Sequence, residues 1–350
     1  MGNALYHEDV SRCLSWSLPW ERLRGKSVVL SGGTGLIGSF FVDVIMYLNK
    51  ETGSGTSVYV LCRNKEYAER RFIRYSGEPL FNFIEKDITK EFDFDFPCDY
   101  ALHLASNTHP LAYSSDPIGT ITSNVYGTKN MLDYAASHGC IRFLFASSNE
   151  IYGENRGDVE FFDEKYCGYI DCNTLRACYT ESKRCSESLC NAYSAQKNLD
   201  CVIARLTRSY GPTMRMDDSK ALSQFIRNAL NNENIVLKSD GSQFYSFSYV
   251  ADAVQGIFTV LLRGESSQAY NIADPASDTT LGELARLIAG LCGVSVVFEN
   301  PSRAEKAGFS AATKARLDSS KIKSLGWRCC YPIDKGISRT LEIMGMQIKC

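Results

Sequence analysis

A tyrosine and a lysine, Tyr179 and Lys183, stand four positions apart in the stretch RACYTESKR (176–184). Side chains at this spacing lie on one face of a helix, about one turn apart. A lysine ammonium beside a phenol favours the phenolate and lowers the pKa of the tyrosine, and an oxidised nicotinamide acts in the same sense. The pair could then remove a proton from a substrate hydroxyl while a hydride leaves the same carbon.

A glycine-rich turn, SGGTGLIG (31–38), offers a place for such a dinucleotide. Gly32, Gly35 and Gly38 follow the apolar stretch SVVL (27–30) and precede apolar residues at helical spacing. This order predicts a strand, a turn and a helix, the context in which glycines let backbone amides approach a pyrophosphate. The N-terminus of the helix adds positive potential there. The alternative is a tight turn that binds nothing.

The residues after the next two predicted strands affect which dinucleotide is bound. Many dinucleotide folds carry an acid for the adenosine ribose about 20 residues after the glycines, whereas this chain has Cys62 and Arg63. Arg63 could accommodate a 2′-phosphate or stack on adenine, so NADP stays open beside NAD. Asp87 could hydrogen-bond the adenine amino group, or it could cap a turn.

A third segment, FASSNEIYG (145–153), places polar side chains at the end of a predicted strand. Ser147, Ser148, Asn149 and Glu150 are too polar for a core, and open α/β proteins bind ligands at the carboxyl ends of their strands. The alternative is a polar surface loop. Each of the three segments is weak alone, but their order and topological places together predict one site.

Strands and helices alternate around these segments. Strands are predicted at 27–30, 57–64, 81–88, 99–106, 141–148 and 200–207, and helices after the glycine turn, at 124–139, around Tyr179, near 219–231, at 251–263, at 281–293 and from about Pro332. The alternation predicts an α/β protein with a Rossmann-type, doubly wound parallel sheet and a smaller, interleaved α/β substrate-binding lobe.

The same pattern suggests how the chain is divided. We expect a helical lead-in at 1–24 and an NAD(P)-binding Rossmann domain at 25–207, completed by about 240–265. Residues 208–350 should form mainly the substrate-binding lobe.

Composition excludes several kinds of partner. The chain of 350 residues is 44% hydrophobic and 22% charged with a net charge of −2, which favours neither nucleic acid nor a membrane surface. No apolar run approaches the roughly 20 residues of a spanning helix, and the N-terminus lacks a signal-peptide profile. The 14 cysteines form no CxxC pair. We interpret them as reduced thiols in a cytoplasmic protein without a metal site.

Taken together, these segments resemble the extended short-chain dehydrogenase/reductase family of nucleotide-sugar epimerases, dehydratases and decarboxylases. The resemblance covers about residues 25–345 and is nearest to the UDP-glucuronate decarboxylases. The segments that carry it are HLASNTHPLAY (103–113), NVYGTKNML (124–132), RACYTESKRCSESLC (176–190), ARLTRSYGPTM (204–214), GSQFYSFSYVAD (241–252) and AYNIADP (269–275).

The resemblance implies a redox cycle on NAD that leaves the cofactor unchanged. Tyr179 takes the proton of the sugar C4 hydroxyl, Ser148 hydrogen-bonds that oxygen, and Glu150 assists the steps between oxidation and hydride return. The candidate catalytic residues are Tyr179, Lys183, Ser148, Glu150 and Asn149. The cofactor-binding candidates are Gly32, Gly35, Leu36, Ile37, Gly38, Arg63, Asp87, Ile88, Leu104, Ala105, Ser106, Tyr179 and Lys183. The substrate-binding candidates are Tyr113, Ser148, Asn149, Glu150, Arg208, Arg215, Tyr245 and Arg316.

Four positions depart from the family pattern. Asn149 stands where dehydratases have an acidic aspartate, which weakens the case for 4,6-dehydration. Arg208 replaces an asparagine of decarboxylases, whereas Thr213 and Tyr245 replace arginines, so the charge that faces the substrate diphosphate is rearranged. Arg215 or Arg208 could compensate.

The expected function is decarboxylase-like modification of a nucleotide sugar through transient C4 oxidation. The alternatives are a 4,6-dehydratase or C4 epimerase, an NAD(P)H-dependent keto-sugar reductase, and a non-catalytic dinucleotide-binding sensor. The resemblance also implies a homodimer in which the helix at about 124–138 and the Tyr179 helix form a four-helix bundle. We expect Met131, Tyr134 and several cysteines on the outer faces of these helices; alternatively, the second lobe covers those faces.

Overall fold

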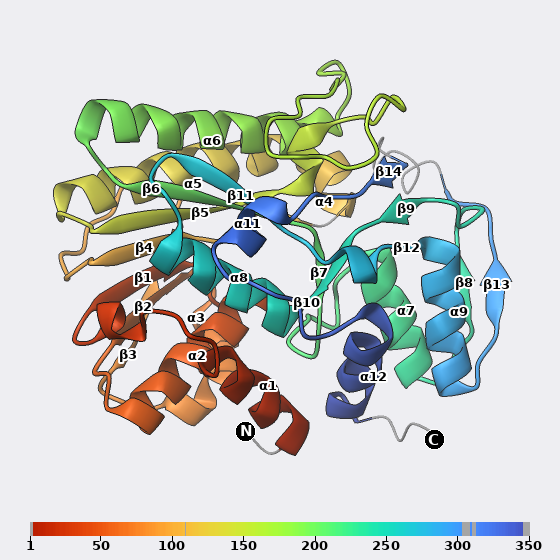
Figure 1. Cartoon of the computed structure of the whole chain (residues 1–350), viewed down its shortest axis with the longest axis horizontal. Helices are drawn as coiled ribbons and strands as arrows, with labels where there is room; N and C mark the ends of the chain where they lie inside the picture. The colour runs from red at the N-terminus through yellow and green to blue at the C-terminus, as the bar shows by residue number, and fades with distance from the viewer. Residues whose placement is uncertain (1–2, 109, 303–308, 310–312, 346–350) are drawn as a thin grey trace.

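A seven-stranded parallel sheet forms the centre of the computed structural model, which describes residues 3–108, 110–302, 309 and 313–345 (Figure 1). The strands lie in the order β11-β6-β5-β4-β1-β2-β3. Their bounds are β1 (Ser27–Ser31), β2 (Ser57–Cys62), β3 (Phe81–Glu85), β4 (Tyr100–His103), β5 (Arg142–Ser148), β6 (Cys201–Leu206) and β11 (Gln268–Ile272). The order reverses between β1 and β4, and ligands of such sheets bind at the carboxyl ends of the strands beside this reversal. The predicted fold class is confirmed.

The six predicted strands are all present, and several end earlier than the sequence indicated. The predicted ends at 63–64, 86–88 and 104–106 lie outside the strands. At these points the chain leaves the sheet and forms loops at its carboxyl edge. The seventh strand, β11, was not predicted as part of this sheet.

Helices cover both faces of the sheet (Figure 1). Val28 and Leu30 of β1 point to the face covered by α2 (Leu36–Thr52) and α8 (Val250–Arg263), and Val29 points to the opposite face. That opposite face carries α5 (Pro117–Ser137) and α6 (Ala177–Lys197). Burial on both faces explains why the strands are continuous apolar runs in the sequence.

Two expectations about α5 need correction. The helix begins at Pro117 rather than near 124, because the Asp116 side chain accepts a hydrogen bond from the Gly119 amide and Pro117 suits the first helical position. Met131 and Tyr134 are not on its outer face. Met131 is fully buried and Tyr134 is nearly so, since both pack toward the sheet and the segment at 92–96. The outer face carries Ile118, Ile121 and Tyr126 instead.

The remaining predicted helices are confirmed, and further short elements appear. The predicted ones are α7 (Ala221–Leu230), α9 (Leu281–Cys292) and α12 (Ile333–Ile343), and the lead-in contains α1 (Ala4–Leu14) and η1 (Trp20–Leu23). The elements that the sequence did not indicate are α3 (Lys65–Arg71), α4 (Pro110–Ser115), α11 (Ser320–Ser324), η2 (Ile73–Tyr75), η3 (Asn149–Tyr152) and η4 (Pro275–Ser277). In the described part of the chain, no helix is both long and apolar enough to cross a membrane.

Short strands of the second half form three small sheets beside the carboxyl edge. They are β7 (Arg208–Tyr210) with β10 (Phe247–Tyr249), β9 (Phe244–Tyr245) between β12 (Thr279–Thr280) and β14 (Lys314–Ala315), and β8 (Ile235–Leu237) with β13 (Val296–Phe298). Between these strands, α8 and β11 return the chain to the large sheet. The division into lobes stays a prediction, and parts of its ranges, 1–2, 303–308, 310–312 and 346–350, lie outside the described residues.

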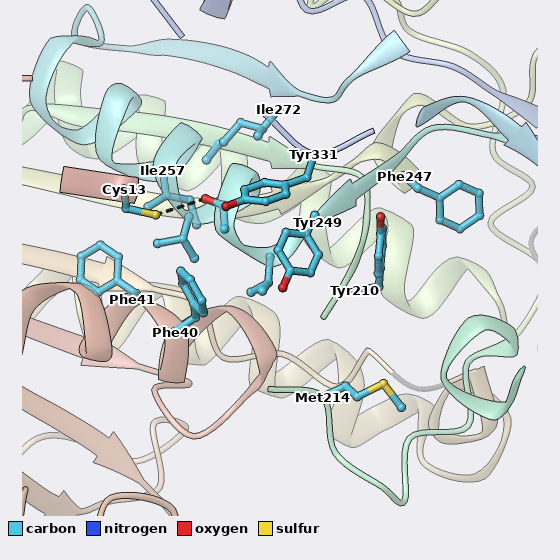
Figure 2. Packing of buried hydrophobic residues seen from close by; sticks show 14 of the residues in the cluster. Cys13, Phe40, Phe41, Tyr210, Met214, Phe247, Tyr249, Ile257, Ile272 and Tyr331 are labelled. Atoms are coloured by element: carbon cyan, nitrogen blue, oxygen red, sulfur yellow. Dashed lines mark hydrogen bonds between the residues drawn. The ribbon is translucent and has the colours of Figure 1, made fainter. Parts of the chain in front are cut away.

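Aromatic side chains join the large sheet to the second half of the chain (Figure 2). Phe41 of α2 stacks on Phe258 of α8 with ring centroids 4.3 Å apart. Tyr249 of β10 lies between Tyr331 and Tyr210, at centroid distances of 4.9 and 5.8 Å. This core holds β7 and β10 beside the carboxyl edge of the sheet.

A buried ion pair ties α1 to α12. The Asp9 carboxylate is fully buried, and it accepts hydrogen bonds from Arg339 Nε at 2.8 Å and from the Tyr249 hydroxyl at 2.6 Å. We predict that Arg339→Leu lowers the free energy of unfolding by about 3–5 kcal/mol, because it leaves a buried carboxylate without its cation. Urea denaturation at pH 7 measures this. Arg70→Leu, which removes an exposed arginine of α3, is the control; equal effects of the two changes would contradict the prediction.

Candidate active site

A cavity of about 810 Å³ lies at the carboxyl ends of the strands. The glycine turn, the ends of β2, β4 and β5, the start of α6, and residues of β7, β9 and α7 all line it. The thirteen predicted cofactor-binding residues all lie on its wall, as do seven of the eight predicted substrate-binding residues. The fold therefore brings these residues together, and their individual roles remain predictions.

The glycine turn packs closely against the end of β4. Gly32 has a φ of +73°, and a Cβ atom there would lie 2.6 Å from the Ala105 amide nitrogen. A Cβ atom on Gly38 would lie 2.3 Å from the Gly32 carbonyl oxygen. Gly35 precedes α2 as its N-cap, no side-chain cap is found there among the described residues, and the first residues of the helix line the cavity. Such a turn fits the pyrophosphate of a dinucleotide.

At the end of β3, Asp87 accepts hydrogen bonds from the Thr89 amide and hydroxyl, both at 2.9 Å. Burial alone would raise the pKa of Asp87, but these bonds, with Arg63 nearby, lower it below its ordinary value. The Asp87 side chain thus caps its own turn while it lines the cavity. Its position is compatible with both predicted roles, a turn cap and a partner of the adenine amino group. Cys62 and Arg63 stand at the end of β2 in place of an acid.

Tyr179 and Lys183 lie one turn apart on α6, and both are buried. Lys183 has 2% of its surface exposed, and its Nζ donates a hydrogen bond to the Ala146 carbonyl oxygen of β5 at 2.8 Å. The same nitrogen lies 6.0 Å from the centroid of the Tyr179 ring. The β5 backbone therefore fixes the lysine beside the phenol.

Burial dominates the electrostatics of this pair. It raises the pKa of Tyr179 to about 12, although a side-chain hydrogen bond with Ser148 and the charge of Arg176 act in the opposite direction. Burial lowers the pKa of Lys183 to about 7, which Glu187 offsets only in part. In the protein alone, the loss of solvation outweighs the nearby charges. That Lys183 and an oxidised nicotinamide together lower the pKa of Tyr179 stays a prediction.

Glu150 stands between two arginines. Its carboxylate lies 2.7 Å from Arg176 Nη2 and 3.3 Å from Arg208 Nη2. The Arg176 guanidinium lies 4.4 Å above the Tyr113 ring, and that of Arg208 lies 3.5 Å above the Tyr245 ring. Sequence reasoning missed Arg176, although its position three residues before Tyr179 places it on the same helical face.

Other polar residues on the cavity wall differ in their burial and in their hydrogen-bond partners. Ser147 and Asn149 are buried, and Ser147 Oγ has no hydrogen-bond partner among the described residues. Arg215 lines the cavity but is paired with Asp217 at 2.6 Å. Lys220, which was not predicted, also lines the cavity and donates a hydrogen bond to Thr108 at 3.1 Å.

Arg316 is the predicted substrate-binding residue that lies off the wall of this cavity. It pairs with Asp278 at 2.9 Å and with Glu160 at 3.1 Å, and its guanidinium lies 4.0 Å from the Phe161 ring. In β14, Ala315 pairs with Tyr245. Arg316 directly follows β14, and its two ion pairs hold its guanidinium beside Asp278 and Glu160.

Comparison with known proteins agrees with this geometry. The sequence matches the NAD dependent epimerase/dehydratase family over residues 28–273. It is 30% identical over 325 residues to UDP-glucuronic acid decarboxylase 1 of Xenopus tropicalis, covering 93% of this chain and 73% of that protein. It is 34% identical over 311 residues to UDP-glucuronic acid decarboxylase 6 of Arabidopsis thaliana, covering 89% and 86%.

Solved structures show the same fold at lower identity. UDP-glucose 4-epimerase of Thermotoga maritima superposes with a TM-score of 0.76 at 23% identity, over 91% of this chain and 98% of that one. UDP-glucuronic acid 4-epimerase of Bacillus cereus, solved with UDP-glucuronic acid and NAD, superposes with a TM-score of 0.76 at 18% identity. The superposition again covers 91% of this chain and 98% of that one. The Rossmann fold and its glycine turn define a dinucleotide-binding protein. The chain belongs to the NAD dependent epimerase/dehydratase family.

The buried lysine yields a pH-dependent prediction. The Lys183 pKa is about 7 in the folded protein against 10.5 ordinarily, so between these values the unfolded chain binds more protons and this lysine destabilises the fold increasingly as the pH falls. We predict that Lys183→Met becomes more stable relative to the wild type when the pH is lowered from 9.5 to 7.5. Urea unfolding of both proteins measures the difference. A difference that is unchanged or reversed would contradict the burial argument.

Proposed function

We propose that the protein modifies a nucleotide-activated sugar by transient oxidation at C4 and that the reaction is decarboxylation of a sugar acid. The observation that carries this proposal is the convergence of Ser148, Tyr179 and Lys183 on one wall of a cavity whose other end is the glycine turn. The similarity to UDP-glucuronic acid decarboxylases supports decarboxylation in particular.

The residues of the chain have distinct tasks in this scheme. The turn at Gly32, Gly35 and Gly38 and the start of α2 would hold the pyrophosphate of NAD, which supplies hydride acceptance and return when bound. Tyr179, as the phenolate that Lys183 and an oxidised nicotinamide would favour, removes the C4 hydroxyl proton. Ser148, whose side chain hydrogen-bonds the phenol, would also hydrogen-bond that sugar oxygen. Tyr179 is 5% exposed, so little of its own surface contacts water.

The side chains beside Ser148 favour loss of carbon dioxide over loss of water. Dehydration requires an acid to protonate the departing hydroxyl. Asn149 has an amide at that place, and Glu150 is paired with two arginines. A carboxylate beside a 4-ketone leaves as carbon dioxide without protonation of the leaving group, and the enolate that remains takes up one proton at C5 from water before hydride returns to C4. Decarboxylation therefore places the smaller demand on these residues.

We predict that Tyr179→Phe abolishes turnover of UDP-glucuronate, by at least about 10²-fold, because the proton acceptor is lost. NAD binding should stay within about twofold of the wild type, since the glycine turn is untouched. Product analysis by mass spectrometry and NAD titration by fluorescence measure the two quantities. Full activity of the variant would exclude Tyr179 as the base.

The same assay separates the other reactions. Loss of water would indicate a dehydratase, and a new chromatographic peak of unchanged mass would indicate an epimerase. A net change in absorbance at the nicotinamide band during turnover would indicate a keto-sugar reductase instead of an internal redox cycle.

We also propose a cytoplasmic homodimer that pairs α5 and α6 of each copy in a four-helix bundle. Ile118, Ile121 and Tyr126 of α5 are 75%, 44% and 55% exposed, which leaves an apolar surface on this helix. The cysteines that the structure describes are free thiols, in keeping with a reducing compartment.

Ile121→Glu should shift the protein from dimer to monomer in light scattering at micromolar concentration, because it buries a charge in the apolar bundle. Ile73→Glu changes an isoleucine that is 71% exposed at η2, and it should leave the dimer intact. A monomeric wild-type protein would contradict the dimer.

A further inference from the structure

We propose that Arg176 and Arg208 together recognise an acidic group on the sugar ring and that this group binds beside the Glu150 carboxylate, which the two arginines already share. The inference rests on the proposed nucleotide-sugar function and assigns the residues that select an acidic sugar. It places this selection on the wall formed by β5, α6 and β7, away from Arg316.

The cluster carries more positive than negative charge. Two guanidinium groups share the single carboxylate of Glu150, at 2.7 and 3.3 Å. Burial alone would lower the pKa of Arg176, but Glu150 and the neighbouring tyrosines raise it, so the arginine stays charged. The three side chains thus have a net charge of about +1 when all are ionised. A second carboxylate would balance it.

The arginines also have unused donors. Among the described residues, Arg176 Nε and Nη1 and Arg208 Nη1 are buried without a hydrogen-bond partner. A buried donor left unpaired costs roughly 1–3 kcal/mol. Guanidinium groups match the oxygens of a carboxylate in pairs, so a ligand carboxylate would satisfy these donors as well as the charge.

Two tyrosines hold the guanidinium planes in place. Tyr113 lies under Arg176 and Tyr245 lies under Arg208, at 4.4 and 3.5 Å from ring centroid to Cζ. Stacking on a ring face leaves N–H edges of a guanidinium available for hydrogen bonds. Both arginines, both tyrosines and Glu150 line the same cavity. The cluster is therefore oriented before a ligand arrives.

The position of the cluster indicates which part of the substrate it meets. The Arg176 guanidinium lies 5.8 Å from the centroid of the Tyr179 ring. Glu150 follows Ser148 by two residues, and Ser148 hydrogen-bonds the same phenol. An anion held here is adjacent to the carbon whose hydroxyl Tyr179 deprotonates. This favours a ring carboxylate over the more distant diphosphate. A neutral sugar would leave the net positive charge of the cluster unbalanced.

The test measures binding to the full-length, NAD-loaded protein by calorimetry with three probes, UDP-glucuronate, UDP-glucose and UDP. The wild type should bind UDP-glucuronate more tightly than UDP-glucose. Arg208→Gln should weaken UDP-glucuronate binding at least about tenfold, since a charge-assisted contact is lost, and should change the other two less than about threefold. Arg328→Gln, which removes an arginine bonded to the carbonyls of Lys323 and Trp327, is the matched control.

Three results would overturn the inference. Equal weakening of all three probes would assign Arg208 to the diphosphate. A wild type that binds UDP-glucose as tightly as UDP-glucuronate would remove the selection for acid while leaving the proposed function in place. Failure of the wild type to bind any nucleotide sugar would overturn both. Should Arg208→Gln fail to fold, Arg208→Lys keeps the charge without the paired donors and should show the same selective loss to a smaller extent.

Discussion

Close packing between the glycine turn and the end of β4 is the constraint on which the site depends. A side chain on Gly32 would have no room against the Ala105 backbone, so glycine lets the turn lie directly against the end of β4. The crevice that opens there lies where the strand order reverses. The ends of β2 and β3 are on one side of it, and β5 and α6 are on the other. Residues far apart in the sequence therefore share one cavity wall.

Within that cavity, burial sets the protonation states more strongly than neighbouring charges do. It keeps the Tyr179 phenol protonated at neutral pH and makes Lys183 a weaker base than an exposed lysine. The proposed reaction therefore needs a further positive charge, that of the oxidised nicotinamide, to form the Tyr179 phenolate. The Glu150 carboxylate lies against two guanidinium groups, 2.7 Å from Arg176 Nη2 and 3.3 Å from Arg208 Nη2.

The sequence predicts features that depend on local spacing and cannot predict those that depend on distant pairing. The glycine turn and the Tyr179–Lys183 pair are set by residues within one turn or helix, and the Tyr179–Arg176 spacing could have been found in the same way. The contact of Arg208 with Glu150 and Tyr245 depends on how β7 and β9 lie beside β5, which no local pattern encodes. The contacts of Arg316 with Asp278 and Glu160 likewise join segments that are far apart in the sequence.

The central claim is that one carbon is oxidised and then reduced within a single turnover. Incubation with NAD and UDP-glucuronate that carries deuterium at C4, followed by mass spectrometry, tests this most directly. The account predicts a product that has lost carbon dioxide and retains the deuterium at C4, because the hydride that leaves is the hydride that returns. A product that has exchanged the deuterium for solvent hydrogen, or a substrate that remains unchanged, would contradict it.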